Sequence, residues 1–223
     1  MQTLSLGPYF SLICEITIVT GFFLADAAGQ AQIFVRVRGV NLGRIAMGFQ
    51  WSTEVLLVNR FGAALYFFML ALYIESGGTI ERLFLLVSLG LALVITFNMW
   101  MITKLLSSLN FSDLGVTLRA ENSTLAAAFV ATLFSILGLT VPYFSGIFYP
   151  EYRLTLANSS FLLNTFFSIL IVFVVDKRVA VYIDSSNKRL GPLASLVIIF
   201  KTLGLLVMLV AYLLAYNMGA WLK

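Results

Sequence analysis

Three arginines, Arg36, Arg38 and Arg44, crowd residues 35–46 of a chain whose neighbouring segments are mostly apolar, and Arg60 follows further along. The guanidinium group is planar and charged, and it binds phosphate oxygens through two parallel hydrogen bonds. These residues therefore offer contacts for an anionic headgroup. A second interpretation stays open, because basic residues beside apolar spans also set membrane orientation, and a long arginine side chain also reaches the membrane interface.

Acidic side chains also interrupt the apolar segments, at Glu15, Asp26 and Glu54. Ionisable residues inside a membrane span are costly and mark functional sites by default. Glu15 and Asp26 are separated by nearly three helical turns, so they share one face, either as an acidic wall of a polar cavity or as an interfacial residue and a helix-pairing residue. We expect Glu54 and Arg60 each to face another helix or a shared aqueous cavity. Lys201, in the last apolar segment, is expected to extend its ammonium group to the cytoplasmic side.

Composition limits the class of protein and the chemistry. The chain has 223 residues, of which 61% are hydrophobic and 11% charged, and its mean hydropathy is +0.99. A soluble domain is about a quarter charged, so we expect an integral membrane protein and no nucleic-acid partner. Histidine is absent and Cys14 is the sole cysteine. No catalytic motif is found, so the sequence predicts a protein without covalent chemistry, cofactor or metal site.

Apolar stretches long enough to cross a hydrocarbon core of about 30 Å predict an all-α bundle of about six spans in one domain, residues 1–223. The second stretch would be ~48 Å long as a straight helix, so we expect it to kink or to break near residues 59–62, with Arg60 near the outer interface. The first span is expected to be retained rather than cleaved. The six predicted spans are residues 9–33, 43–74, 83–106, 124–148, 156–175 and 192–220.

The distribution of basic residues between the connecting segments predicts the orientation of the chain. The first, third and fifth loops hold nine Lys and Arg residues, whereas the second and fourth loops and the C-terminal tail hold three. Lysine and arginine accumulate in cytoplasmic loops. We therefore expect both termini to lie outside.

Two blocks of sequence resemble one known family. The first is residues 36–46 with Arg60 following, and the second is the run from Pro150 to Arg153 with a polar pattern after it. In that pattern Asn158 and Asn164 precede a hydrophobic run that ends at Asp176, and Asp184 follows at a family-like spacing. The two blocks, in this order, resemble the Amj family of bacterial lipid II flippases, which are alternates to MurJ.

The resemblance implies movement of an undecaprenyl-pyrophosphate-linked disaccharide pentapeptide from the inner to the outer leaflet of the bacterial cytoplasmic membrane. On that basis the arginines are expected to bind the pyrophosphate headgroup, at loading for residues 36–44 and at release for Arg60 and Arg153. The acidic residues would couple a proton or cation, or balance the arginines. The expected partners are lipid II and membrane lipids; the oligomeric state and the energy source stay open.

Two other functions remain possible from the residues alone. The face shared by Glu15 and Asp26 would suit a proton- or cation-coupled transporter of a small solute. A membrane scaffold that transports nothing would instead tolerate neutralisation of Asp26, Glu54 or Arg60. The number of ionisable residues within spans argues against the scaffold.

Overall fold

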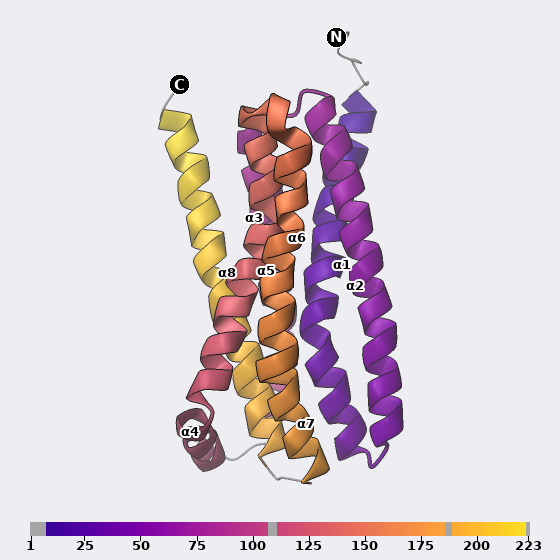
Figure 1. Cartoon of the computed structure of the whole chain (residues 1–223), viewed down its shortest axis with the longest axis vertical. Helices are drawn as coiled ribbons and strands as arrows, with labels where there is room; N and C mark the ends of the chain where they lie inside the picture. The colour runs from indigo at the N-terminus through magenta and orange to yellow at the C-terminus, as the bar shows by residue number, and fades with distance from the viewer. Residues whose placement is uncertain (1–7, 107–110, 186–188, 222–223) are drawn as a thin grey trace.

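The computed structural model describes residues 8–106, 111–185 and 189–221, and every described element is helical. The helices stand side by side, except for the short α4, which lies across one end of the bundle (Figure 1). This arrangement confirms the predicted all-α membrane bundle. The elements are α1 (Pro8–Asn41), α2 (Ile45–Glu75), α3 (Ile80–Leu106), α4 (Phe111–Ala120), α5 (Asn122–Phe148), η1 (Pro150–Tyr152), α6 (Arg153–Leu170), the π-helical segment η2 (Ile171–Asp176), α7 (Lys177–Asp184) and α8 (Leu190–Trp221).

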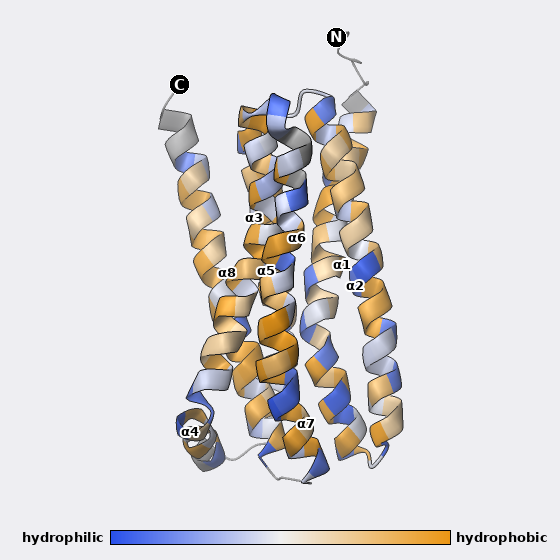
Figure 2. Cartoon of the chain, in the orientation of Figure 1, coloured by the Kyte–Doolittle hydropathy of each residue, from blue (hydrophilic) through white to orange (hydrophobic). Residues whose placement is uncertain are grey.

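Five of these helices, α1, α2, α3, α5 and α8, are long and apolar enough to span a membrane, as the mostly hydrophobic α8 illustrates (Figure 2). The sixth predicted span, residues 156–175, lies in α6 and η2, which continue into α7 as one rod because the residues that join them keep helical backbone angles. The start of α1 and the end of α8 lie at the same end of the bundle (Figure 1). We call the opposite end, which holds the α1–α2 turn and α7, the basic end. Which side of a membrane it faces stays a prediction.

The predicted break in the second span is wrong, because α2 continues as one α-helix of 31 residues through Asn59 to Gly62. Gly62 marks a close approach of two helices instead: a Cβ there would lie 2.5 Å from the backbone nitrogen of Ala25 in α1. Small residues allow such backbone contact between membrane helices. Since α1 is also long, with 34 residues, the two form a hairpin that extends beyond a hydrocarbon core as a unit.

Two hydrophobic clusters fill the interior, one toward each end. The cluster far from the basic end includes Phe22, Tyr66 and Leu91, and the cluster near it includes Val37 and Val197. A band of polar residues lies between these clusters, near the middle of the bundle. We call it the polar layer; its residues are Asp26 and Gln30 on α1, Asn59 on α2, Asn98 on α3, Thr132 and Ser135 on α5, Asn164 and Ser168 on α6, and Lys201 and Thr202 on α8.

Candidate functional site

A cavity of about 220 Å³ opens within the polar layer, among α1, α2, α5, α6 and α8. Seven polar side chains line it, at a height where a lipid bilayer supplies no water. Buried polar groups without partners are costly in hydrocarbon, so a cavity of this kind is a functional candidate. Its lining residues are Ala25, Asp26, Gly29, Gln30, Asn59, Ala63, Phe67, Ser135, Leu139, Asn164, Phe167, Ser168 and Lys201.

Lys201 is the cation inside this cavity. Its residue is 6% exposed, and within the described part of the chain it makes no hydrogen bond or ion pair. The carboxylates of Asp176 and Asp26 and the guanidinium of Arg36 are close enough to act on its charge. The expected reach of Lys201 to the membrane interface is therefore wrong, because the residue is buried and lines the cavity.

The α1 wall of the cavity is acidic. Asp26 is 6% exposed and accepts a hydrogen bond of 3.4 Å from the amide nitrogen of Gln30, one turn further on. The amide oxygen of Gln30 has no hydrogen-bond partner among the described residues. On α2, the Asn59 amide donates to the backbone carbonyl of Ala25. Asp26 thus faces a cavity that also contains a lysine, with an unpaired acceptor beside it.

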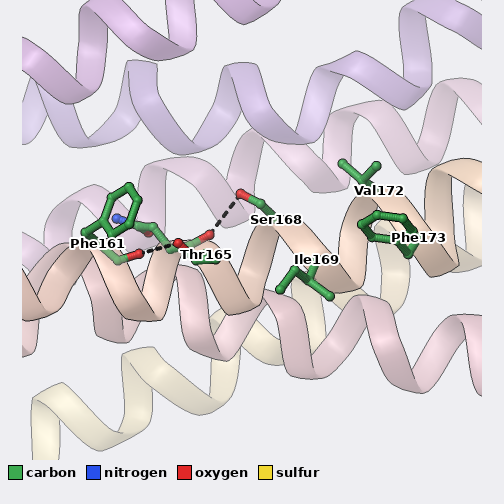
Figure 3. A pocket seen from close by; sticks show the side chains of 7 residues that line it. Phe161, Thr165, Ser168, Ile169, Val172 and Phe173 are labelled. Atoms are coloured by element: carbon green, nitrogen blue, oxygen red, sulfur yellow. Dashed lines mark hydrogen bonds between the residues drawn. The ribbon is translucent and has the colours of Figure 1, made fainter.

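The α6 wall continues the polar surface outward. A second hollow of about 280 Å³ follows α6 and η2 and shares Asn164 and Ser168 with the cavity. Figure 3 shows this hollow from Phe161 and Thr165 at one end, past Ser168, to Phe173 at the other. The rod packs against α5, whereas its close contacts with α1 and α2 are few. We call the cavity and this adjoining hollow together the cleft: residues of both the α1–α2 hairpin and α6 line its inner part, and residues of α6 and η2 line its outer part.

An ion pair closes this cleft toward the basic end. Arg36 Nη1 lies 3.0 Å from Asp176 Oδ1, the last residue of η2, and Arg36 Nε donates to Ser52 Oγ on α2 at 2.9 Å. The guanidinium also lies 5.7 Å from the centre of the Phe49 ring. Arg36 thus ties both helices of the hairpin to the rod at the π-helical segment, a kind of segment that is often functional in helices.

A hydrogen-bonded cluster around Glu121 holds the rod to α5 on the side away from the cleft. Glu121, just before α5, accepts hydrogen bonds from Arg178 and Tyr182 on α7 and from Thr124 on α5. Burial alone would raise the pKa of Glu121, but these three donors and the Arg178 charge outweigh it and lower the pKa below its usual value. Sequence analysis missed this cluster.

The basic residues predicted to bind a headgroup do not share one cavity. Arg36 lies in the ion pair, Arg38 is exposed between α1 and α3, and Arg44 is exposed in the α1–α2 turn, with Met47 Sδ 4.0 Å away. Arg60 is exposed at the middle of α2 rather than near the outer interface. It precedes Ala63, which lines the cavity, by three residues, so the two lie on neighbouring parts of the α2 surface.

The remaining predicted residues lie apart from the cavity. Glu15 pairs with Arg82 on α3 far from the basic end, at 2.7 Å, so it forms no acidic wall with Asp26. Glu54 is exposed, accepts a hydrogen bond from Gln50 and lines no described cavity, so the prediction that it faces another helix or a shared cavity is wrong.

Two other predicted residues lie at opposite ends of the rod. Asp184 ends α7 and is exposed. Arg153 begins α6 at the other end, and its side chain lies outside the described residues. Of the candidates taken from the second block, Asn164 and Asp176 thus reach the cavity or its closure.

The polar groups of the cavity are a carboxylate, an amine, amides and hydroxyls, all of which can hydrogen-bond a polar ligand. The described residues contain no group of three or more carboxylate or cysteine ligands placed to hold a metal ion. A comparison with protein-family models finds no match, and comparisons with curated proteins and with solved structures find none either. The function is therefore argued from the cavity and the cleft.

Proposed function

We propose that the protein moves the anionic headgroup of a polyprenyl-linked precursor, with lipid II as the expected cargo, across the bacterial cytoplasmic membrane. The observation that carries the proposal is the polar cavity at mid-height, together with the hollow on α6 and η2 that adjoins it. A headgroup passing through such a cavity keeps polar partners. Its polyprenyl tail stays in the lipid outside the cleft.

The charges along this route support an anionic cargo. Lys201 lies inside the cavity, and Arg60 is exposed on α2, one helical turn before the lining residue Ala63. Desolvating a pyrophosphate without partners costs many kcal/mol, and cationic hydrogen-bond donors offset that cost. The outer faces of the two walls carry exposed apolar residues, Phe61 on α2, Phe161 on α6 and Phe173 on η2, which suit contact with a lipid tail.

The size of the cavity sets a condition on the proposal. Its 220 Å³ are below the roughly 300–1,000 Å³ of sites for drug-sized ligands, and a disaccharide pentapeptide is larger than such a ligand. The cleft must therefore widen during transport. The rod is the element suited to move, because it packs against α5 but makes few contacts with the hairpin, and Asp176 holds it to Arg36.

The same volume favours a second candidate, a proton- or cation-coupled transporter of a small solute. Asp26 and Lys201 in one cavity place a proton or cation acceptor beside a site for an anion. Such a transporter would need no lateral cleft. The two candidates therefore differ in whether a polyprenyl lipid is needed.

The test is the accessibility of lipid II at the outer surface. In cells depleted of other lipid II flippases, an added enzyme cleaves lipid II that has reached the outer leaflet. We expect cleavage to depend on expression of this protein. Unchanged cleavage would rule out the flippase, and proton-coupled solute uptake by vesicles without polyprenyl lipid would support the transporter instead.

A further inference from the structure

A second hollow with basic residues lies at the basic end, between the last turns of α1 and α3. Its volume is about 380 Å³, and it shares no lining residue with the polar cavity. Phe34, Arg38 and Asn41 of α1 line it together with Trp100, Lys104 and Leu105 of α3. Nothing in the proposed transport route uses this hollow.

The lining contains the same pair of residue types on both helices, an aromatic residue followed by a cation. On α1 the cation Arg38 follows the aromatic Phe34 by four residues, and on α3 Lys104 follows Trp100 by four residues. Four residues of α-helix rise about 6 Å, so each cation lies one turn nearer the helix end than its aromatic partner. The centroids of the Phe34 and Trp100 rings are 6.2 Å apart, so the aromatic part of the lining is continuous across the two helices.

We infer that this hollow is a binding site for an anionic phospholipid, with the phosphate between Arg38 and Lys104 and the start of an acyl chain against Phe34 and Trp100. Basic pockets between membrane helices bind such headgroups, and tryptophan prefers the interface where headgroup and chain meet. The inference is independent of the proposed transport function.

The helix ends explain why a lipid fits better than a free anion. Both α1 and α3 end beside this hollow, and the carbonyl groups at a helix C-terminus carry partial negative charge. That partial charge attracts the side chains of Arg38 and Lys104 but weakens the binding of a small anion. A phospholipid adds apolar contact with Trp100, which is half exposed on the outside of the bundle.

The test uses quenching of Trp100 fluorescence in the full chain in neutral detergent. The protein has three tryptophans, so Trp51→Phe with Trp221→Phe leaves Trp100 as the single reporter. Phosphatidylglycerol with brominated chains is the probe, and brominated phosphatidylcholine is the zwitterionic comparison. We expect phosphatidylglycerol to quench at lower concentration, and Arg38→Gln with Lys104→Gln to weaken its binding about tenfold or more.

Two further variants separate the site from charge in general. Arg44→Gln with Arg119→Gln removes two exposed cations from the same end and should leave the binding unchanged. Arg38→Lys with Lys104→Arg keeps both charges and should retain binding. Equal quenching by the two lipids, or an equal loss in the Arg44 and Arg119 variant, would overturn the inference. Displacement of the lipid by millimolar inorganic phosphate would reassign the hollow to a soluble anion.

Discussion

Lys201 and Thr202 are neighbours on α8, yet they lie in two seams of opposite character. Thr202 lies in the seam between α3 and α8, where the Asn98 amide donates to its hydroxyl at 3.0 Å. The hydroxyl in turn donates to the carbonyl of Ile198 at 2.7 Å, and fully buried Val94 and Leu205 lie in the same region of the core. Lys201 faces the cleft, where its ammonium group has no hydrogen-bond partner among the described residues.

Polar side chains have different roles in these two interfaces between membrane helices. In the α3–α8 seam, polar side chains hydrogen-bond across helices, which adds modestly to stability. In the cleft, polar side chains line open space, which costs stability unless something binds there. Substitutions in the first seam should therefore change folding, and substitutions in the second should change transport.

The largest expected effect is on transport and comes from Lys201→Met. A hydrogen bond to a charged group contributes about 1.5–3 kcal/mol, so losing the lysine should slow headgroup passage by about 10- to 100-fold. The apolar replacement removes a buried charge, so the free energy of unfolding should stay the same or rise. Outer-surface cleavage of lipid II and thermal unfolding of the purified variant measure the two effects.

The matched control is the neighbouring residue. Thr202→Val removes the interhelical hydrogen bond from Asn98, and such bonds average about 0.6 kcal/mol in a membrane protein. Transport should remain within about twofold of the wild type while stability falls by about that amount. The comparison between the seams fails if the two substitutions have the same effect on transport.

Hydropathy alone predicted the helices well, because a span must be long and apolar whatever its neighbours are. The predicted spans 83–106 and 124–148 correspond to α3, Ile80–Leu106, and α5, Asn122–Phe148. The break in α2 was wrong because it was inferred from the length of the apolar stretch alone. The long helix is accommodated instead by pairing with the similarly long α1, and Gly62 serves close packing against Ala25.

The site was harder to predict because membrane helices are apolar on most sides, so periodicity does not reveal which face meets which neighbour. Asp26 was identified as a candidate from its charge alone. Lys201 carries the same signal, a charge within an apolar span, but its long side chain favoured the prediction of an interfacial position. The pairing of Arg36 with Asp176 joins residues 140 positions apart, and nothing local specifies it.

An intermediate effect is expected from the ion pair that closes the cleft. Asp176→Asn removes the charge that holds Arg36, and a partly exposed pair of this kind contributes about 1 kcal/mol at most. The fraction of molecules in which the cleft is open toward the basic end should therefore increase about fivefold. In a Cys14→Ser background, Ser135→Cys places a thiol in the cavity, and the rate of its labelling by a charged thiol reagent measures opening.

Asp184→Asn is the control for this measurement, since Asp184 is an exposed carboxylate on the same rod. It should leave the labelling rate unchanged. A labelling rate that Asp176→Asn does not raise would mean that the cleft is closed by packing rather than by the ion pair. In that case the cleft would resemble the α3–α8 seam more closely than we propose.

The smallest expected effect concerns Glu121, which holds the rod to α5 on the side away from the cleft. Its lowered pKa means that its stabilisation is complete above the usual carboxyl pKa and is lost as the pH falls through the folded value. Thermal stability should thus be steady from neutral pH down to the ordinary carboxyl pKa of 4.5 and then decrease. Glu121→Gln should lower the melting temperature at neutral pH by roughly 2–4 °C and flatten the acid decrease. Glu54→Gln, far from this cluster, should keep the wild-type pH profile of stability. An identical loss of stability in both variants would show that Glu121 does not anchor the rod.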